Sequence, residues 1–126
     1  MSDFSDSQTA VQELRQIVKT FVDQRDWQQF HTPKNLSMSV AIEAAELMEH
    51  FQWLTPAESQ QLSPEKLDKV GEEMADVFCY LLALANEIDV DLSAALESKM
   101  VKNRLKYPVP EFRGRFGADD PRPVSE

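Results

Sequence analysis

The chain has 126 residues, 42% of them hydrophobic, which is the size and composition of one globular domain. Its formal net charge of −9 argues against a nucleic-acid-binding protein, because such proteins carry a basic face. We expect a cytoplasmic protein without membrane contact, because the single cysteine, Cys79, fits a reducing compartment and there is neither a signal peptide nor an apolar run of about 20 residues.

Apolar residues recur at helical spacing in four stretches, and no stretch alternates in the manner of a strand. The seven prolines lie outside these stretches or at their starts. We expect helices over residues 7–25, 36–53, 64–88 and 92–106. Between the second and third, Thr55-Pro56-Ala57-Glu58 reads as a capping box with proline at its first helical position, which predicts one short turn of helix. The fold class is therefore all-α.

The third predicted helix, residues 64–88, is apolar around nearly its whole circumference. Such a helix must be buried on several sides, and the other short helices of this chain hardly supply enough cover. We therefore expect a homo-oligomer with this helix near its centre. Residues 109–126 are rich in proline, glycine and charge, so we expect one helical domain over 1–108 followed by a flexible tail that is mobile or orders on a partner.

Two segments, thirty positions apart, carry the same acidic pattern. When Val40 is aligned with Val70, Glu43 matches Glu73, Glu46 matches Asp76, and the apolar positions behind them coincide. On a helix, each pair places two carboxylates one turn apart on one face. About ten residues join the two helices, so antiparallel packing would bring all four acids to a common cleft.

Four carboxylates in one cleft repel one another, and a hard divalent cation is the usual remedy. Any one of these acids alone reads more simply as a charge bordering an apolar stripe, but the matched placement and the lack of a lysine at i+4 favour a site. An all-carboxylate donor set suits Mg²⁺ or Mn²⁺. A di-iron bundle would show Glu-x-x-His on two helices, whereas His50 follows Glu46 at i+4 and His31 lies in a predicted loop.

The last predicted helix places Lys99 and Asn103 on the same face as its apolar residues. Burying an ammonium or an amide without a partner is costly, so either one of the carboxylates or a bound phosphate should satisfy them. Arg104 and Lys106 add positive charge near the helix C-terminus, where the helix dipole alone also favours it.

Four aromatic residues complete the candidate site: Trp27 and Phe30 in the first linker, Trp53 after the second helix, and Tyr80 one turn beyond Asp76. Aromatic side chains beside a metal–phosphate site suit stacking on a nucleobase. Hydrophobic packing at helix ends explains each of them, taken alone, equally well.

Together these residues resemble the MazG-like all-α nucleoside triphosphate pyrophosphohydrolases. The metal signature is Glu43-x-x-Glu46 followed by Glu73-x-x-Asp76. The segments Arg25-Asp-Trp-Gln-Gln-Phe-His31, Asn35-Leu36, Phe51-Gln-Trp53 and Ser98-Lys-Met-x-x-Asn-Arg104 with Tyr107-Pro108 are similar to the dCTP pyrophosphatase branch. Two positions depart from relatives: Ile42 stands where many have a further glutamate, and Val18 stands where members of this branch can carry a polar contact to the base.

The resemblance implies a four-helix-bundle-like fold and Mg²⁺-dependent hydrolysis of a deoxynucleoside triphosphate, dCTP or a modified dCTP, to monophosphate and pyrophosphate. The four acids would hold the metal, which positions a water for attack at the α-phosphorus, and Glu46, with Glu43 beside it, would take the proton of that water. Lys99, Asn103, Arg104 and Lys106 would bind the phosphates. Trp27, Phe30, Trp53 and Tyr80 would frame the base, with His31 and Asn35 completing the pocket.

Two rivals remain. The chain can be a non-enzymatic helical adaptor whose acids form only a solvated rim, or a di-iron carboxylate protein. Pyrophosphate release from a nucleotide separates the enzyme from the adaptor, and iron content after anaerobic reconstitution tests the third interpretation.

Overall fold

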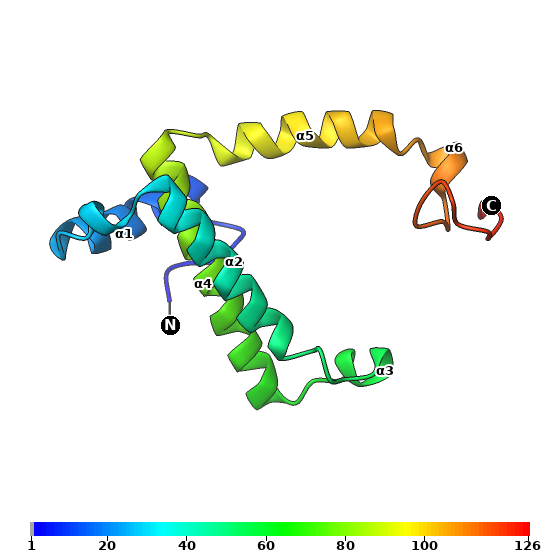
Figure 1. The fold of residues 1–126 in the computed structure, drawn as a ribbon, viewed down its shortest axis with the longest axis horizontal. Coiled ribbons are helices and arrows are strands. Elements are labelled where there is room, and N and C mark those ends of the chain that lie inside the picture. Colours follow the sequence, from blue (N-terminus) through cyan, green and yellow to red (C-terminus); the bar gives the residue numbers. More distant parts are fainter. Residues whose placement is uncertain (1) are drawn as a thin grey trace. The chain divides into compact units, whose positions relative to one another are not determined.

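The computed structural model describes residues 2–126, and within them all regular secondary structure is helical, without a strand. Figure 1 shows the elements in chain order, and their bounds are α1 Val11–Gln24, the 3₁₀ turn η1 Gln28–Phe30, α2 Pro33–Glu49, α3 Pro56–Ser59, α4 Pro64–Ile88, α5 Leu92–Lys106 and α6 Val109–Phe112. The predicted all-α class is confirmed.

The chain divides into two compact units, residues 1–90 and Asp91–Glu126. The first unit contains α1 to α4, and the second contains α5, α6 and the C-terminal loop. The predicted division at residue 108 stays a prediction. No helix in the described part of the chain is both long and apolar enough to cross a membrane.

The helix boundaries follow from local capping groups. Helices α4 and α5 have the bounds that the sequence predicts. They begin there because the side chains of Ser63 and Asp91 accept the backbone N–H groups of Lys66 and Ala94. Helix α2 begins at Pro33, three residues earlier than predicted, because Thr32 Oγ1 accepts the Asn35 N–H at 3.2 Å.

Two other helix boundaries differ from the prediction, and one short helix was not predicted. Helix α1 begins at Val11 rather than at residue 7, because Ala10 is extended and its N–H is taken by Glu13 Oε2 at 2.7 Å. Helix α2 ends at Glu49, and residues 50–53 form turns instead of a last helical turn. The short helix α6 lies in the segment where the sequence predicts only a flexible tail.

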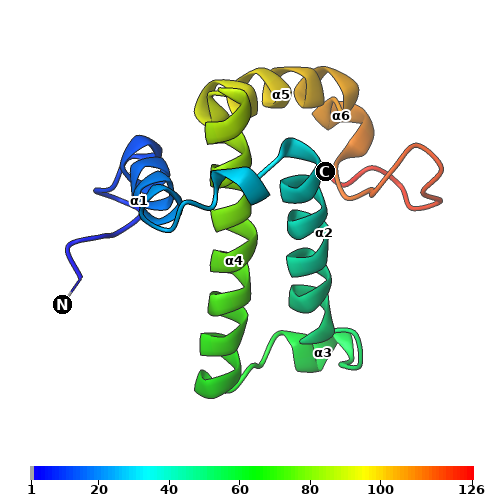
Figure 2. The same ribbon diagram turned by 60° about the vertical axis from the view of Figure 1, so that its left-hand side comes forward.

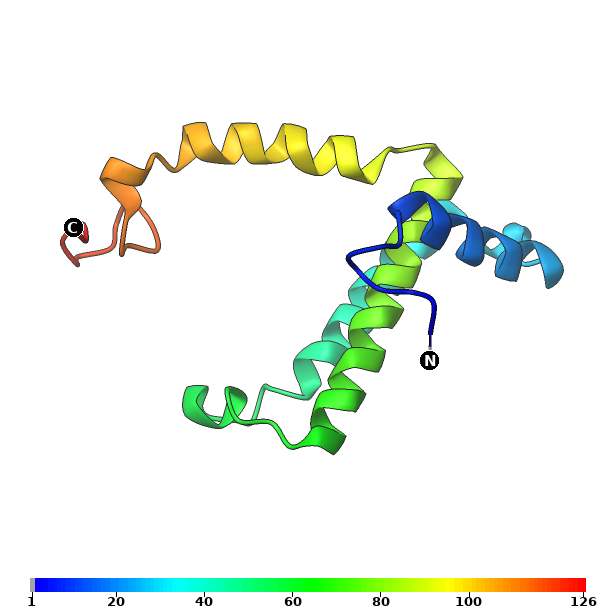
Figure 3. The same cartoon turned by 180° about the vertical axis from the view of Figure 1, so that it is seen from behind.

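Helices α2 and α4 form the antiparallel pair that organises the first unit, and Figures 2 and 3 show them side by side along their length. Leu36 of α2 is buried, as are Val70, Leu82, Ala83 and Ala85 of α4. Because α2 and α4 run in opposite directions, the acidic segment in the second half of α2 lies beside the acidic segment at the middle of α4.

Helix α1 packs on α4 through Val18 and Val22 and is fastened to it by Arg15. The Arg15 guanidinium donates to Asn86 Oδ1 at 3.0 Å, to the Val90 carbonyl at 2.6 Å and to the Ala85 carbonyl at 3.0 Å. Ala85 and Asn86 lie in the last turn of α4, and Val90 follows the end of that helix. A single side chain therefore holds α1 against the C-terminal end of α4.

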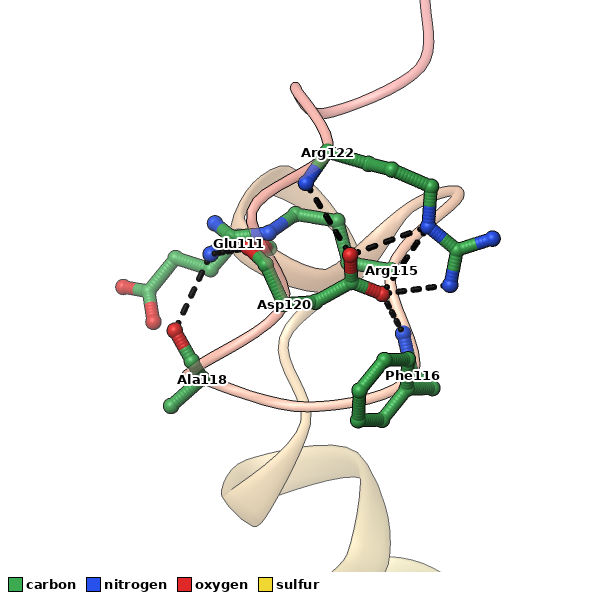
Figure 4. Close-up of polar contacts among 6 residues, drawn as sticks. All are labelled: Glu111, Arg115, Phe116, Ala118, Asp120 and Arg122. Carbon is green, nitrogen blue, oxygen red and sulfur yellow. Dashed lines mark hydrogen bonds and ion pairs between the residues drawn. The ribbon is translucent and has the colours of Figure 1, made fainter.

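The second unit ends in a closed loop organised by Asp120, as Figure 4 shows. The Asp120 side chain is buried and accepts the backbone N–H groups of Phe116 and Arg122 as well as the Arg122 guanidinium. Arg115 donates to the carbonyls of Ala118 and Asp120 on the other side of the loop. The tail thus has a defined internal bonding pattern, while its mobility in solution stays a prediction.

Candidate functional site

The carboxylates of α2 and α4 meet across the helix pair. Glu43, Glu73 and Asp76 each offer one oxygen, and these oxygens lie within 4.8 Å of one another. Glu46 lies beside them, near enough to raise the pKa of both Glu43 and Glu73. The structure therefore brings the four acids of the sequence motifs into one cluster.

Their crowding has a clear electrostatic consequence. The pKa of Glu43 is raised from 4.5 to about 7 by a hydrogen bond with Glu46, by burial, and by repulsion from Glu46, Asp76 and Glu73. The pKa of Glu73 is also raised, mainly by burial and then by repulsion from Glu46 and Asp76. The cluster therefore resists full ionisation unless a positive charge joins it.

The donor atoms fit a divalent cation. Glu43 Oε2 and Glu73 Oε2 are buried and accept no hydrogen bond from any described residue. Buried oxygens rarely stay without a partner, and a bound ion is one of the few explanations for such atoms. Because the clustered donors are all carboxylate oxygens, the residues present suit Mg²⁺ or Mn²⁺ rather than a metal that prefers nitrogen or sulfur.

Two further titratable residues, His50 and Tyr80, lie near the acid cluster. His50 Nε2 lies 3.8 Å from Glu73 Oε1, a contact that sequence reasoning missed although His50 follows Glu46 by one helical turn. Tyr80 is half-buried, and its pKa is raised by burial and then by Glu43, Cys79, Asp76 and Glu46. Tyr80 is thus close enough to the acids for their negative charge to raise its pKa, as its position one turn beyond Asp76 suggests.

The aromatic residues of the first linker pack near α1. Trp27 meets Phe21 edge to face at 5.6 Å between ring centroids, and the His31 ring lies 6.4 Å from the Trp27 ring. His31 also lines a small cavity of about 80 Å³ between α1, η1 and α4, with Val18 and Asn86 among the other lining residues. These contacts place Trp27 and His31 together at one end of the α2–α4 pair.

The other predicted base contacts are more exposed. Trp53 is 86% exposed after the end of α2, and Phe30 is 60% exposed. Asn35 uses its side-chain amide to donate to the Phe30 carbonyl at 3.1 Å, and its backbone N–H donates to Oγ1 of Thr32, the residue that caps α2. A base pocket built from these residues stays a prediction.

The predicted phosphate contacts all lie on α5, in the second unit. Asn103 is half-buried, with Nδ2 3.7 Å from Met100 Sδ. Lys106 Nζ lies 5.3 Å from the centre of the Tyr107 ring, while Lys99 and Arg104 are exposed. The approach of these groups to the acids of the first unit stays a prediction.

The chain is similar to known proteins along most of its length. The model of the MazG-like family matches residues 38–115, which include the acid cluster. The chain is 42% identical over 106 residues to dCTP pyrophosphatase 1 of Rattus norvegicus, covering 82% of this chain and 62% of the relative. It is 43% identical over 100 residues to dCTP pyrophosphatase 1 of Homo sapiens, and this match covers 78% of this chain and 59% of the relative. The chain thus spans about three fifths of the length of these curated relatives.

A solved structure extends the likeness to three dimensions. The crystal structure of a pyrophosphatase from Archaeoglobus fulgidus matches with a TM-score of 0.68 and 38% identity, covering 86% of this chain and 98% of that chain. The helical arrangement is therefore shared over nearly the whole of that protein.

Proposed function

Because the chain belongs to the MazG-like family, we propose that it is a nucleoside triphosphate pyrophosphatase that hydrolyses dCTP, or a modified dCTP, to the monophosphate and pyrophosphate with Mg²⁺. One observation supports this most: oxygens of Glu43, Glu73 and Asp76 lie within 4.8 Å of one another, two of the carboxylates having buried oxygens without a partner in the described chain. Removing such nucleotides from the precursor pool would be the biological role.

The proposed mechanism assigns a role to each acid. Glu43, Glu46, Glu73 and Asp76 would hold Mg²⁺, which when bound would neutralise charge on the triphosphate. Glu46 would accept a proton from the attacking water, so that the new P–O bond forms at the α-phosphorus while the bond to the leaving pyrophosphate breaks. Glu43 stands beside Glu46, and their proximity raises the pKa of Glu43, so Glu43 would assist Glu46.

The other predicted residues would bind the rest of the nucleotide. Lys99 and Asn103, helped by Arg104 and Lys106, would contact the phosphates. Within one chain, the exposed faces of Trp27 and Phe30 would stack on the base, with His31, Asn35 and Tyr80 closing the pocket. Trp53 follows the opposite end of the 17-residue helix α2, so it would reach a base only from another copy of the chain. The similarity to proteins named dCTP pyrophosphatase 1 supports cytosine as the base.

The proposal includes assembly with further copies of the chain. Helix α4 leaves a series of large apolar side chains substantially exposed, namely Leu67, Met74, Phe78, Leu81 and Ile88. Apolar surface of this kind marks an interface more often than free surface. We therefore place α4 at a contact between copies, in a homodimer or homotetramer in the cytoplasm.

A nucleotide panel tests the proposed function. The full chain is incubated with each dNTP, each NTP and cytosine-modified dCTP analogues, with Mg²⁺ or with EDTA, and pyrophosphate is measured. We expect release that needs Mg²⁺ and is fastest for dCTP or an analogue of it. Absence of release from every nucleotide, together with no stabilisation by Mg²⁺, would favour the helical adaptor instead.

A further inference from the structure

His50 lies against one of the acids of the cluster and is fixed at the end of a helix. It is the C-cap residue of α2, and its spacing from Glu43 and Glu46 puts all three on the half-buried face of that helix. Its Nε2 atom lies 3.8 Å from Oε1 of Glu73 on α4, and the two side chains are only 19% and 23% exposed. Within the described residues, His50 is paired with no other carboxylate, so its ring is directed at this one oxygen.

The two carboxylate oxygens of Glu73 have different surroundings. Oε1 faces the imidazole of His50, whereas Oε2 is buried and accepts no hydrogen bond from any described residue. One oxygen each from Glu43, Glu73 and Asp76 lie within 4.8 Å of one another, and this cluster would hold the ion. An imidazole nitrogen that faces a carboxylate directs its hydrogen toward it. The carboxylate is therefore divided: Oε1 is turned toward His50, and Oε2 is left for the cluster.

The number of oxygens that each carboxylate offers helps to decide which hard cation a site prefers. Ca²⁺ takes about six to eight oxygens and often both oxygens of one carboxylate. Mg²⁺ demands nearly octahedral geometry and keeps several waters, so it takes single oxygens from carboxylates. A donor set made of carboxylates does not by itself separate the two ions. A neighbour that occupies the second oxygen of a ligand does, and His50 stands in that place beside Glu73.

We propose that His50 is a positioning residue of the metal site: its Nε2–H holds Oε1 of Glu73, so that Glu73 binds the ion through Oε2 alone and the site favours Mg²⁺ or Mn²⁺ over Ca²⁺. This inference rests on the proposed function, because it needs an ion at the acid cluster. The separation of 3.8 Å exceeds a hydrogen bond, and contacts of this kind shorten when the ligand of a site binds. His50 itself touches neither the ion nor the nucleotide and acts through Glu73.

Substitutions at position 50 separate the Nε2–H group from the size and charge of the ring. His50→Leu keeps much of the bulk and removes both nitrogens. His50→Gln places an amide N–H near the position of Nε2, and His50→Asn places one near the position of Nδ1. Neither amide carries a charge, so rescue by glutamine alone identifies a hydrogen-bond donor at Nε2. The full-length proteins, without nucleotide and first stripped with EDTA, are unfolded thermally at rising concentrations of Mg²⁺, Mn²⁺ or Ca²⁺. The stabilisation gives an apparent dissociation constant for each ion.

We expect the wild type to bind Mg²⁺ and Mn²⁺ more tightly than Ca²⁺. In His50→Leu the dissociation constants for Mg²⁺ and Mn²⁺ should rise about tenfold, whereas that for Ca²⁺ should change less than about twofold, because Glu73 can then offer both oxygens. His50→Gln should stay within about threefold of the wild type, and His50→Asn should resemble His50→Leu. Glu49→Gln, at an exposed neighbouring position on the same helix, should bind all three ions as the wild type does.

Unchanged Mg²⁺ binding in His50→Leu would overturn the inference. Equal losses for Mg²⁺ and Ca²⁺ would also overturn it, because they would mean that residue 50 only supports the fold around the cluster. Asp76→Asn separates these results from a failure of the proposed function. If the wild type and Asp76→Asn bind the ions equally, or if neither binds them, both the metal assignment and this inference are wrong. If Asp76→Asn loses binding while His50→Leu keeps it, only the role of His50 is wrong.

Discussion

Glu43 on α2 and Glu73 on α4 face each other across the helix pair, and each has a buried Oε2 atom that accepts no hydrogen bond within the described chain. Both have a raised pKa, with that of Glu43 at about 7. Two half-buried carboxylates whose oxygens lie within 4.8 Å of each other destabilise each other when both are ionised. The arrangement is therefore costly by itself and becomes favourable only when a cation or a proton joins it.

Replacing Asp76 by asparagine tests the metal assignment. The amide keeps the size of the side chain but removes one anionic ligand, so we expect pyrophosphate release to fall at least about 100-fold. Helicity and oligomeric state should not change, because Asp76 is exposed and borders the cluster. Glu72→Gln is the matched control, since Glu72 is an exposed neighbour on the same helix. Wild-type rates in Asp76→Asn would contradict the assignment.

The metal-free protein should become more stable as the pH is lowered from 8 to 5. The pKa of Glu43 is higher in the folded chain, at about 7, than its ordinary value of 4.5, so between these values the folded state binds more protons than the unfolded state. This contribution to stability is present below pH 4.5 and is lost as the pH rises through 7. Thermal unfolding in EDTA measures it, and Glu43→Gln should flatten the dependence whereas the exposed Glu49→Gln should not.

Mg²⁺ should reverse the dependence of the protein's stability on pH. Carboxylates bind a metal only after they lose their protons, so stabilisation by Mg²⁺ should grow as the pH rises from 5 to 8. The same thermal unfolding series with and without Mg²⁺ measures the difference. A difference that is constant with pH would show that the ion acts away from the acid cluster.

Arg15 should contribute strongly to the stability of the first unit. Arg15→Ala removes three hydrogen bonds to the C-terminal end of α4 and leaves the carbonyls of Ala85 and Val90 without this donor. We expect the free energy of unfolding to fall by about 2–3 kcal/mol, measured by urea denaturation. Arg15→Lys should recover little, because an ammonium cannot reproduce the fork of the guanidinium. The exposed neighbour variant Gln16→Ala should lie within about 0.5 kcal/mol of the wild type.

Asp120 should hold the C-terminal loop closed over the whole neutral range. The hydrogen bond from Arg122 and the N–H groups of Phe116 and Arg122 keep the pKa of Asp120 well below its ordinary value of 3.8. The stabilisation is therefore complete above pH 4 and is lost only as the pH falls through the lowered pKa. Asp120→Asn should increase the amide exchange rate of Phe116 and Arg122 at pH 7. Unchanged exchange at both amides would show that the loop closes without this carboxylate.

Much of the fold follows from periodicity and capping residues. The bounds of α4 and α5 follow from Ser63-Pro64, Asp91 and Pro108, because these residues act locally through their backbone and cap chemistry. The start of α2 differs from its prediction because the aromatic linker obscures the Thr32-Pro33 cap. Helix α6 escapes prediction because four residues carry too little periodicity to be recognised.

Some contacts of the candidate site can likewise be predicted from the sequence, and others cannot. The matched spacing of Glu43 with Glu46 and of Glu73 with Asp76 is enough to predict their cluster, since antiparallel helices preserve such registers. The contact of His50 with Glu73 depends on the rotation of α2 about its axis, which sequence spacing alone does not determine. The same holds for the contacts of Arg15 with α4, which join residues 70 and 75 positions apart and reach backbone carbonyls that every residue carries.

Lys99 offers the sharpest test of the phosphate contacts, because α5 supplies a matched control. Lys99 lies on the face of α5 that also carries Leu92, Leu96 and Asn103, whereas Lys102 lies about 60° further round the helix. Lys99→Met removes a charge that would bind the triphosphate, so we expect kcat/KM for dCTP to fall about tenfold or more. Lys102→Met removes the same charge from the neighbouring face and should change kcat/KM less than about twofold. Equal losses in the two variants would mean that α5 acts through its general positive field and not through a contact made by Lys99.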